Sequence, residues 1–128
     1  MEKKKGVLII DDDKFLLDMY AMKFTENGFD VETALSGSDA LTMLESGKKP
    51  DIVLLDIVMP GVDGFEVLKT IKDKKLVPDA TLVVLSNLGQ KEDVDKGLSL
   101  GASGYIVKAS ATPSEVVTKV KEITAKHA

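Results

Sequence analysis

The sequence contains no cysteine and no arginine, and each absence excludes particular kinds of chemistry. Without cysteine the chain has no disulfide, no thiolate metal site and no cysteine nucleophile, which suits a reducing compartment. We therefore expect a cytoplasmic protein. All 17 basic residues are lysines, so any positive group that acts on phosphate must be an ammonium point charge without the bidentate fork of a guanidinium.

Long apolar runs and an excess of positive charge are also missing. No run approaches the roughly 18 apolar residues of a membrane span, and "MEKKKG" leads into "VLIIDDD" without the features of a signal peptide. The net charge of −4 argues against a broad surface for nucleic acid. The chain has 128 residues, 44% of them hydrophobic and 30% charged, which predicts one globular domain over residues 1–128.

Short apolar runs alternate with segments of helical length along the whole chain. Four runs lack polar alternation, as strands buried on both faces do: "VLII" at 7–10, "IVLL" at 52–55, "TLVVL" at 81–85 and "YIV" at 105–107. The segment 29–34, "FDVETA", is a weaker strand expected nearer an edge. The helical segments are about 14–27, 37–46, 64–75, 90–99 and 113–126. This alternation predicts an α/β fold with a parallel sheet, helices on both faces and right-handed crossovers.

Polar residues follow each of the four strong strands, at the point where the strand ends. They are Asp11, Asp12, Asp13, Asp56, Ser86 and Lys108. In an open α/β sheet the carboxyl ends of the strands lie at one edge, where ligand sites form. We therefore expect acids, a hydroxyl and a lysine to converge there.

Neighbouring carboxylates of this kind favour a bound cation. They repel one another and raise each other's pKa values unless a cation holds them, and hard oxygen ligands favour Mg²⁺ over zinc. With Mg²⁺ and a lysine to neutralise developing charge, Asp56 can act as a carboxylate nucleophile toward a phosphoryl group. Asp13 is instead interpreted as a solvated turn residue.

Four segments together carry a family resemblance. "IIDDD", "LLDIVMPGVDG", "VVLS" and "GASGYIVKA", in this order and spacing, closely resemble the CheY-like receiver domain of two-component response regulators. The resemblance implies a flavodoxin-like (βα)5 fold, a doubly wound parallel sheet of strand order 2-1-3-4-5. It also implies phosphorelay signal transduction, in which a histidine kinase or histidine phosphotransfer protein donates the phosphoryl group and a partner-binding surface is switched.

The resemblance also implies roles for the acids at the strand ends. Asp56 resembles the phospho-acceptor, and Asp11 and Asp12 resemble the acidic pocket that holds Mg²⁺ together with Asp56. The backbone carbonyl of Val58 is implied as a further ligand. Phosphoryl uptake and loss would then be catalysed by the domain on itself, so we expect a regulatory protein and no separate enzymatic activity.

Three other residues resemble the parts that respond to phosphorylation. Lys108 resembles the lysine that pairs with phosphoryl oxygens, Ser86 the switch hydroxyl, and Tyr105 the aromatic that rotates inward when that hydroxyl moves. The chain departs from the family at two positions. Ala109 replaces the usual proline, so a trans and looser turn after Lys108 is expected, and Asn87 is larger than the usual alanine or glycine.

Two other classes of function remain as alternatives. An aspartyl-nucleophile phosphatase has the same acid chemistry, but it usually carries a second Asp two residues after the nucleophile, where this chain has Val58. A nucleotide or flavin module on the same fold would need a Gly-rich phosphate loop after the first strand, where this chain has acidic "DDDKF". Both alternatives are less consistent with the sequence than the regulatory module.

The first helical segment carries apolar residues on two faces. Those spaced three and four apart are expected to face the core; they are Leu16, Met19, Tyr20 and Phe24. Phe15 and Met22 fall on another face and are expected to be exposed beside the acids, as a docking surface for the phosphohistidine-bearing partner. Because receivers that dimerise through salt bridges commonly use arginine, we expect a monomer, either a stand-alone receiver or one excised from a longer chain.

Overall fold

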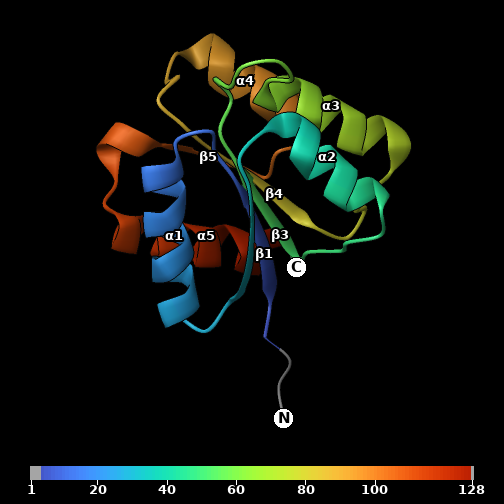
Figure 1. The fold of residues 1–128 in the computed structure, drawn as a ribbon. Helices are drawn as coiled ribbons and strands as arrows, with labels where there is room; N and C mark the ends of the chain where they lie inside the picture. Colours follow the sequence, from blue (N-terminus) through green and yellow to red (C-terminus); the bar gives the residue numbers. More distant parts are fainter. Residues whose placement is uncertain (1–3, 128) are drawn as a thin grey trace.

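One parallel sheet of five strands forms the centre of the protein in the computed structural model, which describes residues 4–127 (Figure 1). The strands are β1 (Gly6–Ile10), β2 (Asp30–Ala34), β3 (Ile52–Leu55), β4 (Thr81–Ser86) and β5 (Gly104–Val107). They pair in parallel in the order β2-β1-β3-β4-β5. This order confirms the doubly wound flavodoxin-like fold, and β2 lies at an edge as its weaker apolar pattern predicted.

Helices cover both faces of this sheet. They are α1 (Lys14–Glu26), α2 (Gly37–Glu45), α3 (Gly64–Lys74), α4 (Lys91–Ser99) and α5 (Pro113–His127), with one 3-10 turn, η1 (Lys108–Ser110). Figure 1 shows α1 and α5 together on one side of the sheet, and α2, α3 and α4 on the other. Within residues 4–127, no helix combines the length and the apolar character needed to cross a membrane.

The strand residues are buried on both faces because their side chains point alternately into two hydrophobic cores. Leu8 and Ile10 of β1 belong to the core under α2 and α3, whereas Val7 and Ile9 belong to the core under α1 and α5. All four are about 1% exposed. The uninterrupted apolar runs of the sequence are therefore explained by helices on both sides.

The burial of α1 corrects one expectation. Leu17, Tyr20 and Phe24 are its buried residues, whereas Leu16 and Met19 are only half-buried. Leu17 lies three residues before Tyr20 and seven before Phe24, so these three form a stripe of the same helical spacing. The helix is therefore turned slightly from the predicted orientation, because apolar residues occur on more than one of its faces.

Candidate functional site

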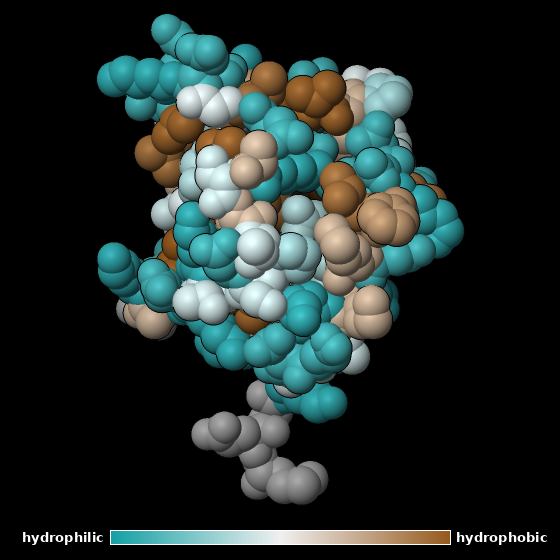
Figure 2. Space-filling model, turned by 90° about the vertical axis from the view of Figure 1, so that its left-hand side faces the viewer, coloured by the Kyte–Doolittle hydropathy of each residue, from teal (hydrophilic) through white to brown (hydrophobic). Residues whose placement is uncertain are grey.

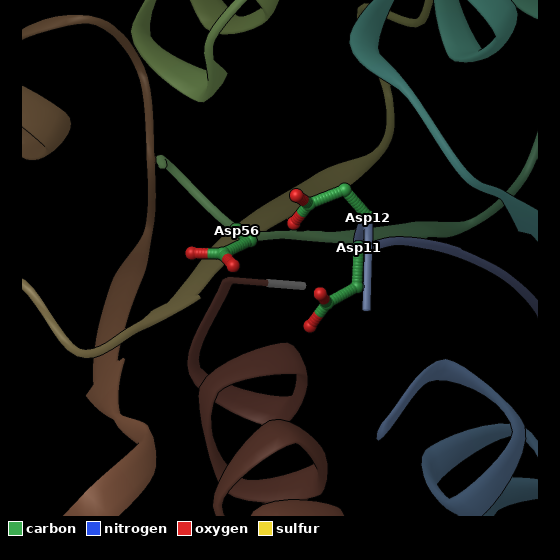
Figure 3. A group of neighbouring side chains, drawn as sticks. All are labelled: Asp11, Asp12 and Asp56. Carbon is green, nitrogen blue, oxygen red and sulfur yellow. The ribbon is translucent and has the colours of Figure 1, made fainter. Parts of the chain in front are cut away.

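Three carboxylates meet at the carboxyl edge of the sheet. Asp11 and Asp12 follow β1, Asp56 follows β3, and the register of these paired strands sets Ile10 beside Leu55, one residue before the acids. One carboxylate oxygen from each acid lies within 4.8 Å of the others. Figure 3 shows the three carboxyl groups turned toward a common space. Asp11 and Asp56 are buried and Asp12 is exposed, so the site opens to solvent on the Asp12 side.

A lysine from the far end of the sequence joins the two buried acids. The ammonium Nζ of Lys108, which follows β5, lies 2.7 Å from Asp11 Oδ2 and 2.9 Å from Asp56 Oδ2. The side chain of Lys108 is only 9% exposed. A buried charge is costly unless it is paired and hydrogen-bonded, and in this bridge the ammonium is paired with both buried acids.

Burial and the contacts between Lys108 and the acids shift the pKa values of Asp11 and Lys108. Burial raises the pKa of Asp11 above its ordinary value, and the hydrogen bond from Lys108 offsets only part of this effect. Burial acts to lower the pKa of Lys108, but its hydrogen bonds with Asp11 and Asp56 and their negative charges outweigh it, so that pKa is raised. Lys108 is therefore a cation over the whole physiological pH range.

Backbone N–H groups hold the carboxylates in position. Asp56 Oδ1 accepts a hydrogen bond from the N–H of Ile57 at 2.7 Å, and Asp11 Oδ1 accepts one from the N–H of Asp13 at 2.9 Å. Asp13 itself accepts from the N–H of Leu16 and caps α1. It is thus an exposed residue outside the acidic cluster, as expected, but its place is a helix cap.

The predicted switch residues are linked through the loop after β4. Ser86 is fully buried, and its Oγ accepts a hydrogen bond from the N–H of Leu88 at 3.3 Å. The half-buried Tyr105 donates its hydroxyl to the carbonyl of the same Leu88. No hydrogen bond joins Ser86 to the three acids in the part of the chain described. Leu88 is the residue that sequence reasoning missed, because its contribution is made by backbone atoms.

The turn after Lys108 has trans peptide bonds, as have all residues within 4–127, so that part of the expectation is correct. The N–H of Ala109 donates to Asn87 Oδ1 at 2.9 Å, and the N–H of Ala111 donates to the carbonyl of Lys108 at 3.3 Å. The turn is therefore hydrogen-bonded at both ends, and its being looser than a turn with proline stays a prediction.

The donor set fits a hard divalent cation. Three carboxylates that can each present one oxygen, with no sulfur or imidazole ligand in the cluster, are the chemistry that Mg²⁺ prefers. Val58, the predicted source of a backbone ligand, lies in the loop after β3, two residues beyond Asp56, and is 60% exposed. Its carbonyl as a ligand stays a prediction.

Comparisons with known proteins agree with the geometry. The family model "Response regulator receiver domain" matches residues 7–121. A CheY-like receiver domain protein of Methanospirillum hungatei is 29% identical, covering 98% of this chain and 97% of that chain, with a TM-score of 0.87. The receiver domain of a Francisella response regulator is 28% identical over 98% and 100% of the two chains, with a TM-score of 0.85. A chemotaxis response regulator of Vibrio cholerae is 25% identical over 94% and 99%, with a TM-score of 0.86.

Proposed function

Because the chain belongs to the response regulator receiver domain family, a family of phospho-accepting regulatory domains, we propose that Asp56 is the residue that accepts the phosphoryl group. One observation carries this proposal: Asp56 is a buried carboxylate held between a lysine ammonium and two further acids that fit a divalent cation. The test is incubation with acetyl phosphate and Mg²⁺, followed by intact mass measurement. Addition of a single phosphoryl group supports the proposal.

The residues of the site divide the work of phosphoryl transfer. A carboxylate oxygen of Asp56 forms the new bond to phosphorus while the bond to the donor breaks, and the donor leaves with its electron pair. Asp11, Asp12 and Asp56 would hold Mg²⁺, which supplies charge neutralisation for the phosphoryl oxygens when bound. Lys108 then exchanges its contact with the Asp56 carboxylate for one with a phosphoryl oxygen, because that oxygen carries the larger charge.

The donor chemistry follows from the family. We propose that a phosphohistidine on a histidine kinase or histidine phosphotransfer protein supplies the phosphoryl group, and that the chain works in the cytoplasm as a monomer. Its own chemistry would be limited to phosphoryl uptake and loss at Asp56. The receiver then acts by changing the surface that it offers to a partner protein, with a phosphoryl charge biasing two conformations.

We expect Lys108→Ala to separate phosphorylation from its structural response. Acetyl phosphate should still modify Asp56, because the nucleophile and the acids remain. The NMR shifts around Tyr105 that accompany phosphorylation should shrink strongly, since Lys108 is the group that ties the end of β5 to the acceptor. Substitution of the exposed Lys119 by alanine is the matched control. A wild-type Tyr105 response in Lys108→Ala would refute the coupling.

Metal binding gives a second expected result. Mg²⁺ should raise the melting temperature by mass action. At a concentration 100 times its dissociation constant, a ligand of the folded state raises the free energy of unfolding by about 2.7 kcal/mol. Asp12→Ala should lose most of this response while staying folded, because Asp12 is exposed and outside both cores. Asp18→Ala, which removes an exposed acid of α1 that is not in the cluster, should keep it. An undiminished response in Asp12→Ala would place the metal elsewhere.

Two exposed apolar side chains of α1 support a docking surface for the donor. Phe15 is 77% exposed and Met22 is 61% exposed, as the sequence predicted. Figure 2 shows the left-hand side of Figure 1, where hydrophobic side chains gather toward the upper part and the right-hand edge of a face that is otherwise largely hydrophilic. Phe15 lies in the first turn of α1, and this helix starts only three residues after Asp11. A donor protein must approach this region to reach Asp56.

We expect Phe15→Ala to slow phosphotransfer from the cognate histidine-containing donor by roughly tenfold or more. This is the effect of losing a docking contact that contributes about 1.4–2 kcal/mol to the binding free energy. Acetyl phosphate needs no docking and should modify Asp56 at the wild-type rate. Leu98→Ala, which truncates an exposed apolar side chain on α4, is the control. Equal slowing with both donors would mean that the site itself was disturbed, and no slowing would leave Phe15 without a docking role.

A further inference from the structure

The two departures from the family pattern meet in one contact. Asn87 follows β4 and Ala109 follows Lys108, and the side-chain oxygen of Asn87 accepts a hydrogen bond from the backbone N–H of Ala109 at 2.9 Å. The register of β4 and β5 pairs Ser86 with Val107. It therefore sets Asn87 beside the turn that carries Lys108. Asn87 directly follows Ser86, and its partner Ala109 directly follows Lys108.

The contact satisfies a specific need of the turn η1. The first N–H groups of a helical turn have no acceptor within the turn, and Val107, which precedes η1, supplies no side-chain cap. Asn87 provides that cap from the loop after β4. A proline at 109 would have no N–H to satisfy, whereas alanine leaves one exposed donor at this point. Asn87 and Ala109 are thus complementary, and the pair replaces the rigidity of a proline ring with a hydrogen bond.

We propose that Asn87 is a positioning residue for Lys108, an inference that rests on the proposed function. By holding the N–H of Ala109, Asn87 fixes the chain directly after Lys108 and keeps its ammonium between Asp11 Oδ2 and Asp56 Oδ2. The same contact joins the loop that begins at Ser86 to the loop of Lys108.

The proposal predicts opposite effects on two properties of the site. Lys108 occupies carboxylate oxygens that a divalent cation also needs, so a loosened Lys108 competes less well and Mg²⁺ binds more tightly. Phosphorylation by acetyl phosphate slows at the same time, because Lys108 is no longer held ready for the phosphoryl oxygens. General damage to the pocket would instead weaken Mg²⁺ binding along with phosphorylation, so the opposite signs distinguish positioning from a structural role.

The test removes the acceptor of the hydrogen bond. Asn87→Leu keeps a similar shape but loses the acceptor, and Ala109→Ser is the control that keeps the N–H. Asn87→Leu should lower the Mg²⁺ dissociation constant, measured by titration of NMR shifts, by about twofold to tenfold, the range of one ordinary hydrogen bond. In an Ala109→Pro background no N–H remains and the ring itself restricts the turn, so Asn87→Leu should add nothing there.

A second readout needs neither metal nor phosphate. In Asn87→Leu the Ala109 amide should shift in the ¹⁵N–¹H spectrum and exchange faster with solvent, while Ala109→Ser keeps a protected amide. An unchanged Ala109 amide in Asn87→Leu, or a Mg²⁺ affinity that stays constant or falls in that variant, would overturn the proposal. Failure of the wild-type protein to accept any phosphoryl group would refute the proposed function, and the amide and Mg²⁺ measurements would still decide the role of Asn87.

Discussion

Asp56→Asn is expected to abolish phosphoryl incorporation from acetyl phosphate, with no added mass under conditions that modify the wild-type protein fully. The amide of asparagine has no anionic oxygen to attack phosphorus, and it cannot replace the carboxylate as a ligand of a hard cation with similar strength. The substitution preserves shape and keeps an acceptor for the N–H of Ile57. Folding should survive, so the loss would be chemical.

The matched control is Asp13→Asn, which removes one negative charge close to the same site. Asparagine caps helices about as well as aspartate, so α1 should keep its first turn, and Asp13 is outside the acidic cluster. This variant is expected to be phosphorylated normally. Incorporation in Asp56→Asn equal to that of the wild type would show that the acceptor is a different residue.

The sequence predicted the central strands well because strands buried on both faces have uninterrupted apolar runs. The run "VLII" has no polar alternation, and residues 7–10 are each about 1% exposed on a strand with neighbours on both sides. The strand order itself came from the family resemblance. The edge position of β2 was visible in "FDVETA", because its polar residues face solvent, where a central strand would face a helix.

The charged part of the site was also predictable, since parallel strands in an α/β sheet end at the same edge. Asp11, Asp56 and Lys108 each follow a strong apolar run, and they form the observed bridge across three strands. The roles of these residues were implied by the family rather than by position. Their convergence, in contrast, follows from the topology alone.

Contacts between loops were not predictable from the sequence. Asn87 and Ala109 are 22 residues apart and meet through a side chain and a backbone N–H, and no periodicity or spacing encodes such a pair. The rotation of α1 was missed for a related reason: its apolar residues are spread around the helix, so a choice between Leu16 and Leu17 needs the neighbouring layer. The end of α3 was predicted within one residue, but the left-handed conformation of Lys75 there, with φ of 51°, was not, because glycine usually takes that position.

Gly64→Ala is expected to destabilise the protein by about 3 kcal/mol or more, the upper range for forcing extra volume into a packed position. Gly64 is buried at the start of α3, and its N–H donates to the carbonyl of Ile57 at 2.9 Å. A Cβ there would overlap the carbonyl oxygen of Asp56 and lie 2.7 Å from Ile57 Cα. Both are backbone atoms, so neither can move without displacing the segment that holds Asp56.

Urea denaturation of Gly64→Ala and of Gly89→Ala gives the comparison. Gly89 is exposed, and a Cβ there would approach only the two side-chain methyls of Val107, the nearer at 3.3 Å. Its replacement should therefore change the free energy of unfolding by less than about 1 kcal/mol. The lower conformational entropy of the unfolded chain with alanine offsets part of the cost of the contact. If Gly64→Ala were as stable as Gly89→Ala, the close packing of α3 against the Asp56 segment would be wrong. If it folds with reduced stability, phosphorylation should also slow, because relief of the overlap moves the backbone of the acceptor itself.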